Sequence, residues 1–257
     1  MEARFTGQVA VVTGGAGGLG VAIAQALGRE GAAVSLLDTN EDAIASAVEG
    51  LRAEGLTAGG FAADVRDPGS VDSAIDQTVS QIGAPTILIA AAGGSLGTPR
   101  DIDDISPADL DLVIDVNVKG TYYCSAAVLP HMKAAGGGSI VTFSSIGGRS
   151  TSPVTGVPYA AAKAGILGLT RRLAREVGPD GIRVNAIAPG LFLTGRLQGM
   201  FDEMSEHDRN EVLDSIPLRR MPLIKECVEP VLFLASHQSS YVTGAVLDVN
   251  GGRFMSG

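Results

Sequence analysis

The stretch "QVAVVTGGAGGLG", residues 8–20, runs from a short β-branched segment through a glycine-rich turn into a helix. Its first six residues are typical of a buried strand, and apolar residues recur at helical spacing over residues 17–31. Between them Gly14, Gly18 and Gly20 follow a G-x₃-G-x-G spacing. Glycine backbone can lie against a pyrophosphate, and a helix N-terminus offers free N–H groups. The stretch therefore predicts a nucleotide-binding turn, and a plain tight turn is the alternative.

The same alternation of strand and helix continues along the chain. Strands that alternate with helices favour a parallel sheet covered on both faces. We therefore expect an α/β fold with a doubly wound parallel sheet of about seven strands, in one domain over residues 1–257, because no linker or repeat interrupts the pattern. The sequence predicts strands at 8–13, 32–38, 57–65, 86–94, 138–145, 182–189 and 245–249, and helices at 17–31, 41–55, 67–83, 106–132, 157–177 and 225–236.

Residues 191–224 interrupt the alternation with a long segment that mixes apolar and charged side chains. Connections of this length in compact domains are often lids or binding loops. We expect an irregular lid over a ligand site there. A pair of surface helices without a ligand is the alternative.

Composition argues against several classes of protein. The chain of 257 residues carries 28 acidic and 19 basic side chains, for a formal net charge of −9, which disfavours nucleic acids and anionic membranes as partners. No apolar run approaches the ~20 residues of a membrane span, and the N-terminus has no signal-peptide pattern. Cys124 and Cys227 stand apart with no histidine cluster, so neither a disulfide nor a metal site is expected. We expect a cytoplasmic protein with a small-molecule partner.

Acidic residues at the ends of two predicted strands indicate the kind of nucleotide. Asp38 follows Gly20 by 18 residues, where a carboxylate can accept hydrogen bonds from the hydroxyls of an adenosine ribose. It would repel a 2′-phosphate, and no Arg or Lys stands at 15–19 or 39–40 to offset it, so NAD is favoured over NADP. Asp64 is placed to accept from the adenine amino group. Capping of a turn or loop is the alternative for both carboxylates.

The stretch "PYAAAKAG", residues 158–165, places Tyr159 and Lys163 one helical turn apart on a shared face. A nearby ammonium stabilises a phenolate and lowers the pKa of the phenol from ~10, so that it can exchange a proton with an alcohol or carbonyl oxygen. A solvated pair on an exposed helix is the alternative. Ser144 and Ser145 end the preceding strand, where open α/β sheets bind ligands, and no nucleophile-elbow pattern supports a serine hydrolase.

The chain resembles the classical short-chain dehydrogenases/reductases, whose motifs it carries in order over essentially its whole length. The resemblance implies a Rossmann-type fold, an NAD-dependent oxidoreductase that interconverts a secondary alcohol and a ketone by hydride transfer, and a homotetramer. The motifs are "TGGAGGLG", Asp38, "DV", "AAGG", "NVKG", "FSS", "YAAAK", "IRVNAIAPG" and "YVTGAVLDVNGG".

The resemblance also implies residue roles. Tyr159 is the general acid/base, Lys163 lowers its pKa and binds the nicotinamide ribose, and Ser145 orients the substrate oxygen. Asn117 holds a water that completes a proton relay, and its alternative is a buried amide that braces a helix. Cofactor contacts are expected from Gly14, Gly18, Leu19, Gly20, Asp38, Asp64, Val65, Ala91, Ala92, Gly93, Tyr159, Lys163, Pro189, Gly190 and Thr194. Substrate contacts are expected from Ser145, Leu96, Val154, Leu191 and Met200, whose mainly apolar character suggests a hydrophobic or cyclic substrate.

Two departures from the family pattern matter. Ala90 and Ala91 replace two asparagines that usually brace the central sheet, so that bracing must be lost or supplied otherwise. The loop before Tyr159 is one residue longer than usual, which leaves the choice between Ser144 and Ser145 open.

Two other functions remain alternatives. One is a reductase of 3-oxoacyl thioesters on an acyl carrier protein, but that branch usually takes NADPH, and Asp38 argues against it. The other is a non-catalytic NAD sensor, and the complete set of Ser, Tyr, Lys and Asn argues against that.

Overall fold

Seven parallel strands form one sheet in the order β3-β2-β1-β4-β5-β6-β7. The computed structural model describes residues 3–151, 155–193 and 196–255. The expected α/β fold with a parallel sheet is confirmed. The strands are β1 (Val9–Thr13), β2 (Ala33–Asp38), β3 (Ala58–Ala62), β4 (Ile87–Ala90), β5 (Gly138–Phe143), β6 (Ile182–Pro189) and β7 (Val246–Val249).

Helices connect the strands, and several begin where the sequence supplies a cap. Asn40 accepts a hydrogen bond from Ala43 N at 3.0 Å, and Ser106 forms a capping box with Asp109. The helices are α1 (Gly18–Arg29), α2 (Glu41–Ala53), α3 (Pro68–Gln81), α4 (Pro107–Ile114), α5 (Gly120–Ala134), α6 (Val157–Val177), α7 (Arg196–Glu203), α8 (Glu206–Asp214) and α9 (Lys225–Ala235). The helix expected over 106–132 is therefore divided, with a π-helical turn at Asp115–Lys119 between α4 and α5.

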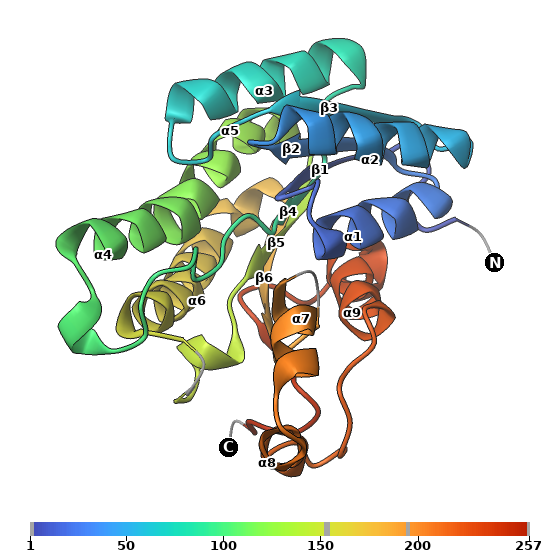
Figure 1. Ribbon diagram of the computed structural model, residues 1–257. Coiled ribbons are helices and arrows are strands. Elements are labelled where there is room, and N and C mark those ends of the chain that lie inside the picture. The colour runs from blue at the N-terminus through green and yellow to red at the C-terminus, as the bar shows by residue number, and fades with distance from the viewer. Residues whose placement is uncertain (1–2, 152–154, 194–195, 256–257) are drawn as a thin grey trace.

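Each face of the sheet is covered by three helices that bury an apolar stripe (Figure 1). On one face α1, α2 and α9 pack their Ile, Leu and Val side chains against the sheet. On the other face α3, α5 and α6 do the same. The strands read as continuous apolar runs because side chains on both of their faces are buried, as all five of β1 are.

The carboxyl ends of the central strands meet at one edge of the sheet. The chain leaves β1 toward β2 on one side, whereas β4 adds on the other side of β1, so strand order reverses between β1 and β4. Such a reversal is where open α/β sheets bind ligands. The glycine-rich turn after β1 and the loops after β4, β5 and β6 therefore surround one cleft.

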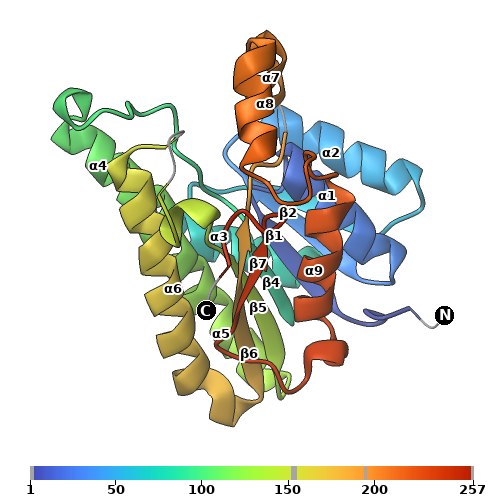
Figure 2. The ribbon, with the colours of Figure 1, turned by 90° about the horizontal axis from the view of Figure 1, so that it is seen from below.

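The segment at 191–224 is more regular than expected, because it contains the two helices α7 and α8. Figure 2 shows α7 and α8 beyond the end of the sheet, across from α4. Buried Phe192 and Ile216 fix the two ends of the segment, while no residue of α8 is buried. The segment is thus a helical pair anchored at its base, and its action as a lid stays a prediction.

Three observations hold over residues 3–151, 155–193 and 196–255. Cys124 and Cys227 are free and buried, as expected. Within these ranges no helix is long and apolar enough to cross a membrane. No group of three or more His, Cys, Asp or Glu side chains in this part of the chain is arranged to hold a metal ion.

Candidate active site

The cleft has two ends, which share Leu19, Ala91, Gly93 and Leu96 in their walls. The glycine-rich end is a cavity of about 660 Å³ bounded by the turn after β1 and the ends of β2 and β3. The tyrosine end is a cavity of about 560 Å³ bounded by the loops after β4, β5 and β6. Gly14, Gly18, Leu19, Gly20, Asp38, Asp64, Val65, Ala91, Ala92 and Gly93, all predicted to contact a cofactor, line the glycine-rich end.

The turn after β1 has the backbone shape that a phosphate group requires. Gly14 adopts φ +64°, and a Cβ at that position would lie 3.0 Å from Ala92 Cα. A Cβ on Gly20 would lie 2.2 Å from Gly14 O, so only glycine lets the helix begin this close to the strand. At Gly17, which precedes α1, a Cβ would meet only Gly14 O, at 3.4 Å, so the helix N-terminus is open. These glycines fit a dinucleotide pyrophosphate, since they leave the N–H groups of α1 accessible.

Asp38, at the end of β2, braces the glycine-rich turn as well as facing the cavity. Its Oδ2 accepts a hydrogen bond from Ala16 N at 3.2 Å, and its Oδ1 accepts one from Thr39 N at 2.8 Å. Each carboxylate oxygen has a second lone pair, so the group can still accept from a ribose diol. The capping alternative and the ribose-binding role are therefore compatible.

Asp64 lies at the glycine-rich end but is already paired. Its carboxylate accepts hydrogen bonds from the Arg66 side chain at 2.6 and 3.0 Å and from Arg66 N at 2.9 Å. The Arg66 guanidinium holds the pKa of the Asp64 carboxyl below its ordinary value. Arg66 also lines the cavity, and the sequence analysis missed it because it stands beyond the strand end rather than in a motif.

The loop after β4 is held without the family's asparagine pair. Ala92 N donates to the buried Thr13 Oγ1 at 3.1 Å, and Ala91 N donates to Ile89 O at 3.0 Å. The bracing that Ala90 and Ala91 cannot supply thus comes in part from a threonine on the neighbouring strand β1. Leu96, farther along this loop, has φ +56°, which is uncommon for a residue with a branched side chain.

Asn117 lies in the π-helical turn and is fully buried. Its Nδ2 donates to Gly94 O at 3.0 Å and to Val113 O at 2.8 Å, and its Oδ1 accepts from Gly94 N at 3.0 Å. A π-turn often marks a functional position, because it turns a side chain out of the regular helical register. Here the amide donates to Val113 O of α4, which fits the alternative of a buried amide that braces a helix, and it also holds the loop after β4. The water relay stays a prediction.

The two serines after β5 face different neighbours. Ser144 Oγ donates to Lys163 O at 2.8 Å, so its hydroxyl is used to hold the strand end against α6. The side chain of Ser145 hydrogen-bonds with Tyr159, and its Oγ also accepts from Gly147 N at 3.1 Å. Ser145, rather than Ser144, is therefore the serine beside the phenol.

Tyr159 and Lys163 project from α6 toward that serine. Lys163 is 4% exposed, and its Nζ donates to Phe143 O at 2.8 Å and lies 5.6 Å from the centre of the Tyr159 ring. Burial lowers the pKa of Lys163 to about 7. Burial also raises the pKa of the Tyr159 phenol, and the hydrogen bond with Ser145 opposes that rise.

The pKa of Tyr159 is therefore raised, whereas the neighbouring Lys163 alone is expected to lower it. The reason is that burial disfavours charge on both groups, so the lysine is only partly charged at neutral pH.

Gly93 is the point where the site residues converge. A Cβ on Gly93 would lie 2.4 Å from Asn117 Oδ1 and 3.3 Å from Lys163 Nζ. Ser145, Tyr159 and Lys163 line the tyrosine end of the cleft. Asn117, from the π-helical turn between α4 and α5, lies behind Gly93 and is not part of that lining.

The remaining predicted residues fall partly at the tyrosine end. Leu96, Pro189, Gly190 and Leu191 line it. Val154 and Thr194 lie outside the described residues, as does the side chain of Met200. Arg100 and Arg253 also line this end, although neither stands in a motif that predicts a site residue. Arg253 directly follows the "NGG" after β7, a strand-end position that could have indicated it.

Curated relatives match the chain along nearly its full length. An uncharacterised short-chain type dehydrogenase/reductase of Sinorhizobium fredii is 41% identical, over 97% of this chain and 98% of the relative. Cyclohexanol dehydrogenase of Rhodococcus sp. is 37% identical, over 96% of each chain.

Solved structures share the fold. A putative short-chain alcohol dehydrogenase from Sinorhizobium meliloti has a TM-score of 0.91 at 34% identity, over 98% of each chain. A 3-oxoacyl-[acyl-carrier protein] reductase from Brucella melitensis with bound NAD has a TM-score of 0.89 at 34% identity, over 99% of this chain and 94% of that one. A gluconate 5-dehydrogenase from Burkholderia cenocepacia in complex with NADP and tartrate has a TM-score of 0.90 at 31% identity, over 98% and 97%.

A family model described as enoyl-(acyl carrier protein) reductase matches residues 14–253. The fold therefore binds a nicotinamide cofactor, and the protein is an oxidoreductase that acts on CH–OH donors. The glycine-rich turn, the strand-end aspartate and the serine, tyrosine and lysine around one cleft are what these relatives lead one to expect, and the chain belongs to the classical short-chain dehydrogenase/reductase family.

Proposed function

We propose that the protein is an NAD-dependent oxidoreductase that interconverts a secondary alcohol and a ketone at the tyrosine end of the cleft. The observation that carries the proposal is that Ser145, Tyr159 and the buried Lys163 line one cavity, with the glycine-rich end alongside. When bound, the nicotinamide supplies the acceptor or donor of a hydride. The chain's own residues then hold the substrate oxygen and handle its proton.

Tyr159 is the proposed proton donor and acceptor at that oxygen. In ketone reduction the phenol O–H gives its proton to the oxygen as the carbon receives the hydride, and in alcohol oxidation the phenolate takes the proton back. Ser145 donates a hydrogen bond to the same oxygen. Because burial raises the pKa of Tyr159, the phenol is neutral at pH 7 and suited to reduction, and oxidation should accelerate as pH rises.

The preference for NAD rests on Asp38. Its carboxylate accepts from Ala16 N and Thr39 N and so is fixed at the glycine-rich end, where it would repel the 2′-phosphate of NADP. The guanidinium of Arg66, which also lines that end, already forms an ion pair with Asp64 and so is not free to bind a 2′-phosphate. Comparing kcat/KM for NADH and NADPH tests the preference, and equal values would contradict it.

The apolar side chains of the tyrosine end support a substrate with a hydrophobic or cyclic body. Leu96 and Leu191 are joined there by three larger apolar residues, namely Phe192, Phe201 and Met204. Cyclohexanone and its substituted relatives are therefore suitable first substrates.

Replacing Tyr159 by phenylalanine tests the mechanism. Tyr159→Phe keeps the ring but removes the proton, so NADH oxidation with a panel of ketones should fall by about 10²- to 10⁴-fold in kcat, while NADH still binds. Tyr241→Phe is the matched control, because Tyr241 is fully exposed and lines neither end of the cleft. Equal activity of wild type and Tyr159→Phe would rule the mechanism out.

A second candidate is reduction of 3-oxoacyl thioesters. The family model's description and the Brucella melitensis structure both name acyl carrier protein reductases, which is the observation that favours it. Turnover of an acetoacetyl thioester on acyl carrier protein that exceeds turnover of simple ketones, with equal or better use of NADPH, would favour this function over the first.

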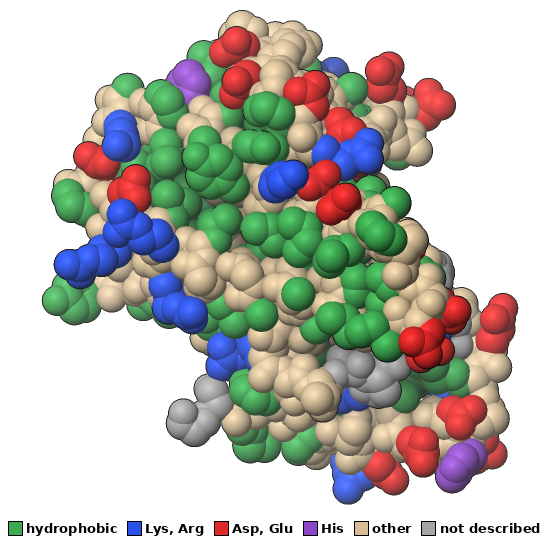
Figure 3. All heavy atoms as spheres, turned by 90° about the vertical axis from the view of Figure 1, so that its left-hand side faces the viewer, with side chains coloured by type: hydrophobic (Ala, Val, Ile, Leu, Met, Phe, Trp, Pro, Cys, Tyr) green, Lys and Arg blue, Asp and Glu red, His purple; other side chains and the backbone are tan. Residues whose placement is uncertain are grey.

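A homotetramer is the proposed assembly. Leu110, Tyr122 and Val157 are exposed on α4, α5 and α6, and Ala164 and Gly165 are exposed small residues of α6. Figure 3 shows the side of the molecule on which α4 and α6 lie, with hydrophobic side chains gathered between scattered charges. Light scattering that gives the mass of a monomer would contradict this assembly.

A further inference from the structure

The charged side chains that line the tyrosine end are all basic in the part of the chain that the structure describes. They are Lys163, Arg100 and Arg253, and no Asp or Glu is among them. The whole chain has 28 acidic and 19 basic side chains, so a cavity whose charged lining is only basic is opposite in sign to the net charge of the chain. The proposed proton chemistry uses Lys163 and leaves the two arginines without a role.

A fixed turn presents Arg253. Arg253 N donates to Asn250 O at 3.2 Å, and the Asn250 side chain donates to Phe254 O at 3.1 Å and accepts from Gly252 N at 3.0 Å. Gly251 has φ +65°, and a Cβ there would lie 2.7 Å from Ile216 Cγ2, so the turn sits directly on the segment that follows α8. The chain around Arg253 is therefore held on both sides of it.

Acidic groups near this turn are engaged elsewhere. Asp248 Oδ1 lies 2.9 Å from Arg149 Nε, an ion pair whose angles do not make a hydrogen bond, and the Arg149 guanidinium lies 5.0 Å from the centre of the Phe254 ring. Glu226 pairs with Arg220.

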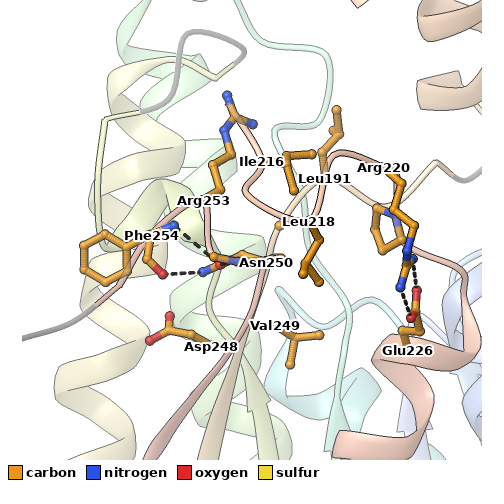
Figure 4. Close-up of a pocket in the computed structure, with 14 residues that line it drawn as sticks. Leu191, Ile216, Leu218, Arg220, Glu226, Asp248, Val249, Asn250, Arg253 and Phe254 are labelled. Carbon is orange, nitrogen blue, oxygen red and sulfur yellow. Dashed lines mark hydrogen bonds and ion pairs between the residues drawn. The ribbon is translucent and has the colours of Figure 1, made fainter. Parts of the chain in front are cut away.

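Figure 4 shows the Arg253 side chain extending away from the Glu226 pair and from Asp248. Over the described residues no carboxylate lies within 4.0 Å of the Arg253 guanidinium.

Arg100 stands on another wall of the same cavity. Its Cα lies 3.2 Å from the position that a Cβ on Gly156 would take, and Gly156 is the N-cap of the helix that carries Tyr159. Arg100 is exposed, and none of the ion pairs among the described residues includes it. The two arginines thus reach the cavity from loops far apart in the sequence.

We propose that Arg253, assisted by Arg100, binds a carboxylate on the substrate. The substrate is then a secondary alcohol or ketone with an apolar body against Leu96 and Leu191 and an anionic end at the arginines. This inference rests on the proposed function. A guanidinium recognises a carboxylate through two parallel N–H···O bonds, and partial burial of Arg253 strengthens that recognition.

Calorimetry with NADH-saturated protein tests the subsite without any turnover. Cyclohexanecarboxylate and cyclohexanecarboxamide have the same body and differ in charge. The carboxylate should bind about 10- to 100-fold more tightly than the amide, and Arg253→Gln should abolish most of that preference. Arg253→Lys should retain part of it, and Arg100→Gln should reduce it about threefold, because Arg100 is more exposed.

Arg29→Gln is the matched control, since Arg29 lies on α1, outside the lining of the cavity, with its side chain 60% exposed. It should leave the preference intact. Equal binding of the two probes, binding of neither, or a preference that survives Arg253→Gln would each overturn the proposal. Tighter binding of cyclohexyl phosphate than of the carboxylate would overturn the assignment to a carboxylate.

Kinetics with a matched pair of alcohols separates this proposal from the proposed function. If 4-hydroxycyclohexanecarboxylate and its methyl ester are oxidised equally well, the subsite is wrong while the oxidoreductase function stands. If the carboxylate probe binds through Arg253 but no alcohol or ketone is turned over, the subsite stands and the proposed function is wrong.

Discussion

The two ends of the cleft obtain their chemistry by opposite means. At the glycine-rich end the groups proposed to bind the cofactor are backbone N–H groups and the carboxylates of Asp38 and Asp64, which are partly exposed and stand at or just beyond strand ends. At the tyrosine end the groups are buried side chains, with Asn117 0% exposed, Lys163 4% and Ser145 8%. Exposed carboxylates keep their charge, whereas burial works against charge on every group that it covers. We therefore expect substitutions at the tyrosine end to reduce activity strongly and substitutions at the glycine-rich end to have smaller effects.

Lys163→Met should have the largest effect. The substitution removes the ammonium beside the phenol and the group expected to bind the nicotinamide ribose, so turnover should fall by about 100-fold or more and NAD should bind about 10-fold more weakly. Steady-state kinetics and titration of cofactor fluorescence measure the two effects. Unchanged cofactor affinity would leave Lys163 only its effect on the phenol.

The same substitution should change how stability depends on pH. The pKa of Lys163 is lowered to about 7 in the folded chain from 10.5, so between these values the unfolded chain binds more protons than the folded one. Stability must then rise with pH across that window, and the cost of the buried ammonium is fully present below about pH 7. Denaturant unfolding between pH 6.5 and 9.5 should show a flatter profile for Lys163→Met than for wild type. Parallel profiles would contradict the lowered pKa.

Gly93→Ala should have the next largest effect, because Gly93 separates the two ends. Its φ of +146° disfavours a side chain, and the added Cβ would displace Asn117 Oδ1. Strain of this kind costs about 1–3 kcal/mol of stability, and activity should fall by about 10- to 100-fold. Thermal unfolding and kinetics measure both. Gly50→Ala on α2 is the control, since a Cβ there meets nothing within 4 Å and neither value should fall.

Asp38→Asn should have a moderate effect that is confined to cofactor choice. The amide keeps the shape but removes the charge that repels a 2′-phosphate, so the ratio of kcat/KM for NADH over NADPH should fall by about 10-fold. The ketone KM should not move, because Asp38 lies at the opposite end from the substrate. A fall in activity with both cofactors alike would show that Asp38 acts only by bracing the glycine-rich turn.

Arg66→Gln should have the smallest effect. The Arg66–Asp64 pair is half-exposed, so its loss should leave the midpoint of unfolding almost unchanged and change the KM for NADH by less than about threefold. Arg29→Gln breaks a comparable exposed pair with Glu54, away from the cleft, and serves as the control. A large rise in the KM for Arg66→Gln alone would mean that Arg66, rather than Asp64, contacts the adenine.

The difference between the two ends also explains how much of the site the sequence could predict. The glycine-rich turn and Asp38 lie within one strand–helix–strand unit, so spacing along the chain translates directly into distance in space. Ser144 and Ser145 are adjacent in sequence, but their side chains contact different neighbours. Which of the two lies beside Tyr159 depends on how the end of β5 packs against α6. The bracing of the loop after β4 by Thr13 likewise depends on strand pairing between β1 and β4.

By itself the sequence determined the order of strands and helices, the parallel sheet, the glycine-rich turn and the Tyr159–Lys163 face, because each follows from local periodicity or short spacing. Only the tertiary structure decided the helical form of the 191–224 segment, the choice of Ser145, and the opposing effect of burial on the pKa of Tyr159. It also decided the meeting of Arg100 and Arg253 in one cavity. Burial and long-range proximity depend on how distant segments pack, and a spacing along one chain does not contain that information.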